Sequence, residues 1–205
     1  MRDKKDYIQD INEIRSMMER TSKFLSLAGW AGIMAGFYAL IGAFTAYYFL
    51  GLTPEVLATR VSPAGTNWLQ LVLTGLVVLA LAVGTAVYFS AEKASRRGER
   101  LWNSTSRRLL LQMSVPLVAG GLLVLILMSQ GYVGLAAPLT LVFYGLALYN
   151  AGNFTYPEIR FLGILQIALG LLSTCFVPLG LFFWATGFGV LHIVYGIYIH
   201  YKYER

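Results

Sequence analysis

Among the polar side chains of the long apolar runs, four are the candidates for hydrogen bonding, titration or ligand binding: His192, Gln166, Gln112 and Asn150. His192 is near the centre of its run, and a neutral imidazole there can bond a neighbouring helix, titrate or bind a metal. The other histidine, His200, is eight residues along the same run. On one helix the two rings project about 80° apart and cannot easily ligate one ion. We therefore expect an interhelical hydrogen bond at His192, and no metal or other cofactor.

Catalytic groups do not form a recognisable set in this sequence. It contains no nucleophile elbow, no HExxH zinc motif and no Walker loop, and no apolar run holds a pair of carboxylates. The middles of the apolar runs also lack charged residues, whereas ion-coupled transporters and pumps commonly carry one near the membrane midplane. We therefore expect a protein that is not an enzyme, and the missing charges argue against an ion-coupled pump.

A second group of residues that could bind a ligand is basic and lies in the segment 91–108: Lys93, Arg96, Arg97, Arg100, Arg107 and Arg108. The simplest role of such a segment is to set the membrane topology and to contact anionic lipid. Clustered arginines can also bind phosphate or carboxylate groups, so a docking surface for a protein or an anionic ligand is the alternative. Gly98 is the one glycine of the segment, so no glycine-rich phosphate loop accompanies the arginines.

The elements that position these residues must lie in a membrane. Of the 205 residues, 57% are hydrophobic and 13% are charged, about half the charged fraction of an average soluble domain. This composition excludes a disordered chain and a disulfide scaffold and argues against a soluble enzyme. The net charge of +6 is explained by a membrane surface rather than by direct nucleic-acid binding. Cys175 is the single cysteine and behaves as a small hydrophobe.

The apolar runs predict an all-α polytopic membrane protein with six transmembrane helices. Each run is long enough to cross a hydrocarbon layer of about 30 Å as a helix, and none shows strand-like alternation. The transmembrane domain would comprise residues 24–205, with spans over residues 24–50, 68–90, 109–128, 132–150, 159–177 and 181–199.

The positive charges predict the orientation. Alternate segments between the six spans hold 15 Lys and Arg residues on one side against one, Arg60, on the other. The positive-inside rule then places both termini in the cytoplasm.

Residues 1–23 are expected to form a cytoplasmic amphipathic helix. Tyr7, Ile11, Ile14 and Met18 recur at helical spacing among charged residues. The helix could lie on the anionic inner leaflet, pack against the segment 91–108, or pair with a partner helix. The sequence does not choose between these three placements.

Small residues indicate where helices approach closely. Gly32 and Gly36 form a GxxxG step, a spacing that lets two membrane helices approach at the backbone. Glycine pairs seven residues apart, which share one helix face, recur at Gly29/Gly36, Gly145/Gly152, Gly163/Gly170 and Gly189/Gly196. They predict tight packing in a compact bundle; a degenerate internal repeat is the alternative. A homo-oligomer is a further alternative.

Four local strings resemble an uncharacterised family of small bacterial six-span integral membrane proteins, common in Bacteroidetes-like genomes. The strings are Glu13–Arg20, Leu101–Arg108, Pro116–Gly121 and Glu158–Gly163, and the resemblance extends over nearly the whole chain. It implies a multi-pass protein of the bacterial inner membrane. The family has no established activity, so the resemblance assigns no residue a role.

Two functions from different classes are compatible with these observations. The first is a non-enzymatic protein that acts by interaction, in sensing or assembly, through residues 1–23 and 91–108. The second is a small-solute binding or transport protein, by analogy with the six-span substrate-binding subunits of some vitamin transporters. The second predicts an outward-facing cavity lined by aromatic residues, with the loop 51–67 as its lid.

Overall fold

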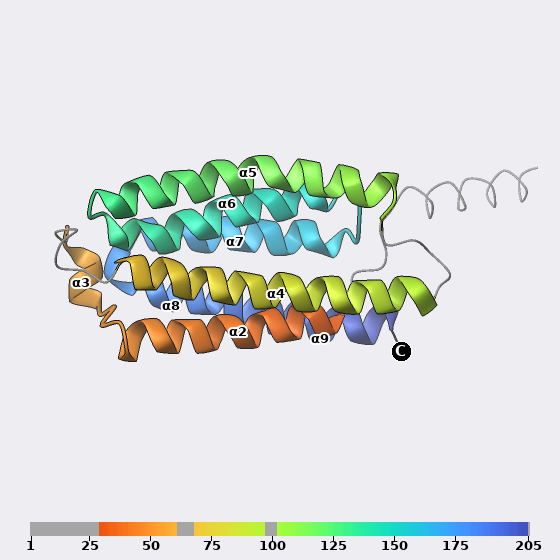
Figure 1. Ribbon diagram of the computed structural model, residues 1–205, viewed down its shortest axis with the longest axis horizontal. Helices are drawn as coiled ribbons and strands as arrows, with labels where there is room; N and C mark the ends of the chain where they lie inside the picture. The colour runs from red at the N-terminus through yellow and green to blue at the C-terminus, as the bar shows by residue number, and fades with distance from the viewer. Residues whose placement is uncertain (1–28, 61–67, 97–101, 205) are drawn as a thin grey trace, which may run out of the picture.

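The computed structural model describes residues 29–60, 68–96 and 102–204, and the regular structure within these ranges is helical (Figure 1). Five long helices are α2 (Gly29–Tyr48), α4 (Trp68–Arg96), α5 (Ser104–Ser129), α6 (Ala136–Ala151) and α7 (Glu158–Cys175). The last helical stretch consists of η2 (Val177–Leu179), α8 (Gly180–Trp184), the π-helix η3 (Ala185–Leu191) and α9 (His192–Tyr203). Two short helices, α3 (Pro54–Ala58) and η1 (Val133–Leu135), complete the described part.

The prediction of an all-α fold with six helices long and apolar enough to cross a membrane is confirmed. Six helical stretches are long and apolar enough to cross a membrane: Gly29–Tyr48, Trp68–Arg96, Ser104–Ser129, Val133–Ala151, Glu158–Cys175 and Val177–Tyr203. In lipid only a backbone that satisfies its own hydrogen bonds can span, which is why each apolar run is helical. The amphipathic helix predicted over residues 1–23 lies outside the described residues.

The segment 91–108 is more helical than the hydropathy pattern predicts. α4 continues through its polar end to Arg96, and α5 already begins at Ser104. A capping box starts α5: the Asn103 side chain accepts from the Ser106 N–H at 2.8 Å, and the Ser106 hydroxyl oxygen accepts from the Asn103 N–H at 2.9 Å. Hydropathy reports where the apolar residues end, whereas this cap is local polar chemistry that starts a helix outside them.

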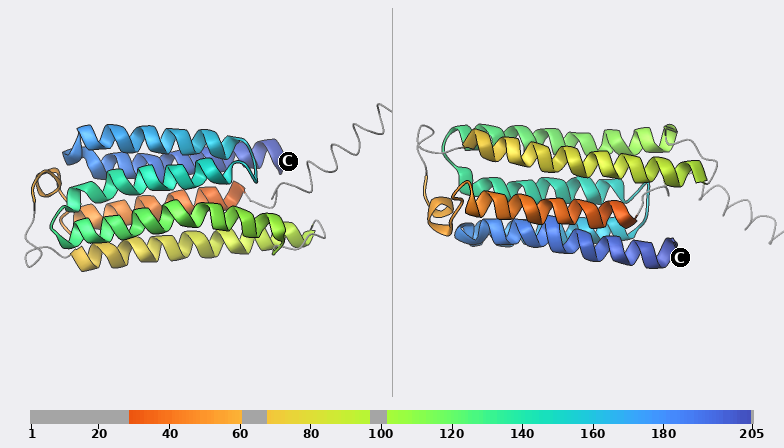
Figure 2. Two further views of the ribbon diagram at one scale, coloured as in Figure 1. Left: turned by 90° about the horizontal axis from the view of Figure 1, so that it is seen from above. Right: turned by 60° about the horizontal axis from the view of Figure 1, so that its bottom comes forward.

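The long helices run side by side along one axis (Figures 1 and 2). α6 packs against α5 and α7, and α2 packs against α4 and α9. One end of the bundle carries Lys93, Glu158, Lys202 and Glu204, and is called the charged end below. α3 lies at the opposite end, called the α3 end.

Two helix pairs cross at glycines. Where α2 packs on α9, a Cβ on Gly29 would lie 2.5 Å from the Gly196 carbonyl oxygen, and where α2 packs on η3, one on Gly36 would lie 2.6 Å from the Gly189 carbonyl oxygen. In the α6–α7 pair, a Cβ on Gly163 would lie 2.7 Å from the carbonyl oxygen of Gly145. All three distances to backbone atoms are shorter than a real Cβ tolerates, so these crossings need glycine.

The remaining glycines named from the sequence lie at the same two crossings. A Cβ on Gly32 would lie 3.1 Å from the Gly196 Cα atom, and a Cβ on Gly170 would lie 2.9 Å from the Pro138 carbonyl oxygen. Gly189 faces the side chain of Leu40. The seven-residue glycine spacing therefore corresponds to two antiparallel contacts, α2 with the last helical stretch and α6 with α7.

Candidate functional site

Two of the four polar side chains expected inside the membrane meet in the middle of the bundle. His192 of α9 and Gln166 of α7 are 6% and 0% exposed. The Gln166 side-chain nitrogen donates to the Gly187 carbonyl oxygen at 2.8 Å, and His192 Nδ1 lies 3.0 Å from the same oxygen. His192 Nε2 lies 2.9 Å from the Tyr144 hydroxyl of α6. We call Tyr144, Gln166, Gly187 and His192 the neutral cluster.

The neutral cluster fixes the form of the imidazole. With the proton on Nδ1, His192 donates to the Gly187 carbonyl, and Nε2 accepts from the Tyr144 hydroxyl. This neutral ring satisfies both nitrogens without placing a charge in the membrane interior. The arrangement joins α6, α7 and α9 and provides the interhelical hydrogen bond that the sequence favours for His192.

The neutral cluster includes one residue of the π-helix. Gly187 lies within η3, and a Cβ there would be 2.5 Å from both Gln166 Oε1 and a methyl carbon of Leu141. Only glycine at position 187 leaves room for the Gln166 side chain to reach the Gly187 carbonyl oxygen. π-helical turns are rare and often occur at functional sites, so this segment is a feature to test.

The other two predicted polar residues lie elsewhere. Gln112 is exposed on α5, and Asn150 is half-buried at the end of α6, where its carbonyl accepts from the Asn153 N–H at 3.2 Å. Neither is among the partners of the neutral cluster. Sequence reasoning missed Tyr144, although a tyrosine well inside an apolar run departs from the aromatic-belt positions typical of membrane proteins.

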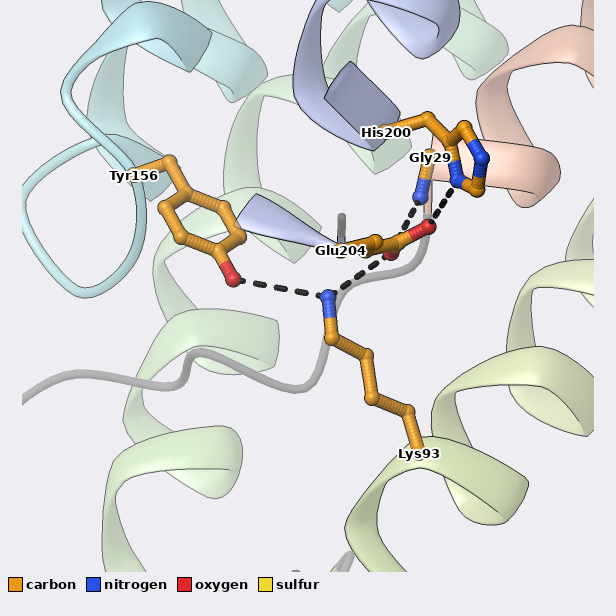
Figure 3. Close-up of polar contacts among 5 residues, drawn as sticks. All are labelled: Gly29, Lys93, Tyr156, His200 and Glu204. Carbon is orange, nitrogen blue, oxygen red and sulfur yellow. Dashed lines mark hydrogen bonds and ion pairs between the residues drawn. The ribbon is translucent and has the colours of Figure 1, made fainter. Parts of the chain in front are cut away.

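The charged end contains a carboxylate with three donors (Figure 3). Glu204 accepts from Lys93 Nζ at 2.8 Å and from the Gly29 N–H at 2.9 Å, and His200 Nδ1 lies 2.7 Å from its second oxygen. Burial raises the pKa of Glu204, but hydrogen bonds from Lys93, His200 and the Gly29 N–H outweigh it and leave the pKa below its ordinary value. Glu204 therefore joins the ends of α2, α4 and α9.

A second ion pair lies beside the first. Lys202 Nζ is 2.5 Å from Glu158 Oε1, and the Tyr203 hydroxyl donates to the same oxygen at 2.9 Å. Tyr203 stacks on Tyr156, with 4.4 Å between ring centroids, and the Tyr156 hydroxyl lies 3.5 Å from Lys93 Nζ. The end of α9 is thus joined to the start of α7 as well as to α4.

The structure corrects one prediction about the basic residues. Lys93 was expected to face lipid or a partner, but its side chain is 13% exposed and pairs with Glu204. The prediction was wrong because Glu204, which buries and binds the Lys93 ammonium group, lies 111 residues away in sequence, and the hydropathy pattern does not show that the two meet. Arg96 is exposed and pairs with Glu92 on its own helix at 2.7 Å. Arg107 and Arg108 are exposed on α5, and Arg97 and Arg100 lie outside the described residues.

The α3 end holds an apolar groove of about 250 Å³. Ala43 and Tyr47 of α2, Leu57 of α3, and Pro178, Phe182 and Ala185 of the last helical stretch are among its lining residues. We call it the α3 groove. Within residues 29–60, 68–96 and 102–204, no three His, Cys, Asp or Glu side chains gather to form a metal site.

Comparisons with known proteins add no relative. No protein-family model, no curated protein and no solved structure matches the chain.

Proposed function

We propose that the chain is a non-enzymatic, multi-pass protein of a bacterial inner membrane, with both termini in the cytoplasm. In this proposal it acts by binding an acidic protein partner at the charged end, in sensing or in assembly. The distribution of Lys and Arg, 15 on one side of the membrane against one on the other, supports this orientation.

One observation carries the interaction proposal: the acids of the charged end are already paired, whereas two arginines are not. Glu204 pairs with Lys93, and Glu158 pairs with Lys202. Arg107 and Arg108 are exposed, and neither has an ion pair within the described part of the chain. The two acids described at this end are therefore already paired, which leaves both guanidinium groups exposed to an external anionic group.

The position of these arginines opposes a purely structural role. Both lie near the start of α5, where the positive end of the helix dipole disfavours cations. Asn103 and Ser106 already satisfy the cap, so the arginines are not needed to begin the helix. Exposed guanidinium groups suit bidentate contacts with the carboxylates of a protein or with the phosphates of anionic lipid.

The test compares full-length wild type with Arg107→Glu/Arg108→Glu in a pull-down from detergent-solubilised membranes. We expect wild type to retain a specific partner and the double variant to lose it. Glu55→Lys, a charge reversal at an exposed position of α3 at the other end of the bundle, is the control and should retain the partner. Absence of any partner, together with solute flux in liposomes that contain the purified protein, would overturn the proposal. Retention that depends only on anionic lipid would replace the protein partner with the membrane surface.

The α3 groove favours a second candidate function, small-solute binding. Leu52, Pro54 and Leu57 from the loop expected to be a lid line this groove, together with the aromatic side chains of Tyr47 and Phe182. Co-purified ligand detected by native mass spectrometry, and lost when Ala185→Phe fills the groove, would support it.

A further inference from the structure

We propose that the α3 groove holds part of one acyl chain of a bilayer phospholipid. This inference deepens the second candidate function by naming the ligand, and it is independent of the partner proposed for the charged end.

The lining can recognise hydrocarbon and little else. Apart from the Tyr47 hydroxyl, the side chains that line the groove carry no hydrogen-bonding group and no charge. A polar solute placed there would lose its hydrogen bonds to water without replacing them, which is unfavourable. An acyl chain has no hydrogen bonds to lose and gains dispersion contacts with the walls.

The rim connects the groove to the lipid-facing surface. Tyr47, Leu179 and Phe182 line the groove and are 43%, 48% and 67% exposed. They belong to helical stretches apolar enough to span the membrane, so their exposed faces lie against lipid. A chain that already lies in the bilayer can therefore enter sideways, without crossing water.

The size of the groove limits what enters. Pockets for drug-sized ligands commonly enclose about 300–1,000 Å³, and this groove encloses about 250 Å³. A whole phospholipid is too large, whereas a segment of one acyl chain fits with its headgroup left outside.

The roof of the groove is held in place. Leu57 is 4% exposed, and its carbonyl oxygen lies so close to Gly134 that a Cβ there would be only 2.1 Å away. Beyond α3, Arg60 Nε donates to the Gln130 carbonyl at 3.1 Å, and its guanidinium lies 4.6 Å from the centre of the Tyr132 ring. Because these contacts fix α3 on the turn between α5 and α6, the groove exists before a chain binds, which lowers the cost of binding.

The experiment uses full-length protein in nanodiscs that contain a phospholipid with a photoactivatable diazirine in its acyl chain. After illumination, the labelled peptides are identified by mass spectrometry. We expect labelling of the α2 and α8 peptides around Tyr47 and Phe182 to exceed labelling of α4, which faces lipid along its length. Ala185→Phe should reduce the groove labelling several-fold and leave the α4 labelling unchanged.

Two control variants make the result decisive. Ala185→Leu fills less of the groove and should give an intermediate reduction, which guards against a folding defect in the larger variant. Ala80→Trp adds bulk at an exposed position of α4 and should leave the groove labelling as in wild type. Groove labelling no stronger than that of α4, or unchanged by both Ala185 variants, would overturn the proposal. Co-purification of a polar solute without groove labelling would support small-solute binding and would overturn the proposal of an acyl chain.

Discussion

The two glycine crossings show how similar contacts are held together by different means. α6 and α7 are neighbours in sequence, joined by residues 152–157, and their crossing at Gly145 and Gly163 is closed by a short connection. α2 and α9 come from opposite ends of the described chain, yet they cross just as closely at Gly29 and Gly196.

The difference between the pairs lies in what joins their ends. No short loop joins α2 to α9, and there the Gly29 N–H donates to Glu204, which also binds Lys93 of α4. The neutral cluster then joins the two pairs through Tyr144 and Gln166 on one side and His192 on the other. Two helices joined by a short connection lose little entropy when they come together. Two helices that are distant in sequence lose more, and polar contacts at their ends help to offset that loss.

The largest expected effect is the loss of either crossing. Gly163→Leu and Gly196→Leu would each place a side chain against backbone atoms of the partner helix, so the helices must separate. Overpacking of this kind costs about 1–3 kcal/mol or more. Both variants should lose thermal stability in detergent, measured by the unfolding midpoint of purified protein.

Gly75→Leu is the matched control for both crossings. A Cβ on Gly75 meets no atom within 4 Å, so this variant should melt like wild type. Equal melting of Gly163→Leu and Gly75→Leu would show that the α6–α7 crossing is not close enough to require glycine.

The next effect is loss of the contact between the two pairs. Gln166→Leu and His192→Phe should each destabilise the protein by about 0.5–2 kcal/mol, the range of buried hydrogen bonds between membrane helices. Because both side chains bond the Gly187 carbonyl oxygen, the double variant should differ from the sum of the single variants. A double-mutant cycle of unfolding free energies measures this coupling, and strict additivity would contradict a shared cluster.

A smaller effect distinguishes the end of the distant pair from that of the local pair. The pKa of Glu204 lies below its ordinary value of 4.5, so ionised Glu204 stabilises the folded state above that pH. The stabilisation is lost as the pH falls through the folded-state pKa. Glu204→Gln should melt at lower temperature than wild type at pH 7, with the difference shrinking in acid.

Glu92→Gln is the control for this pH dependence. Glu92 forms an exposed pair with Arg96 within α4, and such pairs contribute about 0–1 kcal/mol. Melting curves across acid and neutral pH should show little difference between this variant and wild type. If Glu204→Gln lowers the melting temperature by the same amount at every pH, the charge of the Glu204 carboxylate is not what stabilises the α2–α9 end.

The smallest expected effect belongs to the arginines that no crossing needs. Arg107→Gln/Arg108→Gln should change the unfolding free energy by less than about 0.5 kcal/mol, as expected for surface positions without partners. Thermal unfolding of the purified double variant is the measurement. A large loss of stability would show that these arginines hold the bundle together, and would weaken the proposed role in binding.

The spans and the crossings were accessible from sequence because each leaves a local signal. Long apolar runs predicted the six helices, and glycines seven residues apart predicted faces of close approach. His192 was accessible for a similar reason, since an ionisable side chain in an apolar run requires a partner.

What could not be predicted depends on pairs of distant residues. Nothing near Lys93 in sequence shows that Glu204 will bind it, and nothing near Gln166 shows that Gly187 will present its carbonyl. The α3 groove has the same character, because Ala43, Leu57 and Ala185 line it from three separate segments. Such contacts depend on how the whole bundle packs, and they leave no local pattern in the sequence.

The unequal lengths of the helices have a consequence for the membrane that suits this protein. At about 1.5 Å per residue, the 29 residues of α4 extend about 44 Å, whereas the 18 residues of α7 extend about 27 Å. The short α7 cannot lengthen to match a thick bilayer, which must thin around it, whereas the long α4 can match a thin bilayer by tilting. Hydrophobic mismatch should therefore favour thinner bilayers, and lipids with short chains should stabilise the bundle more than lipids with long ones.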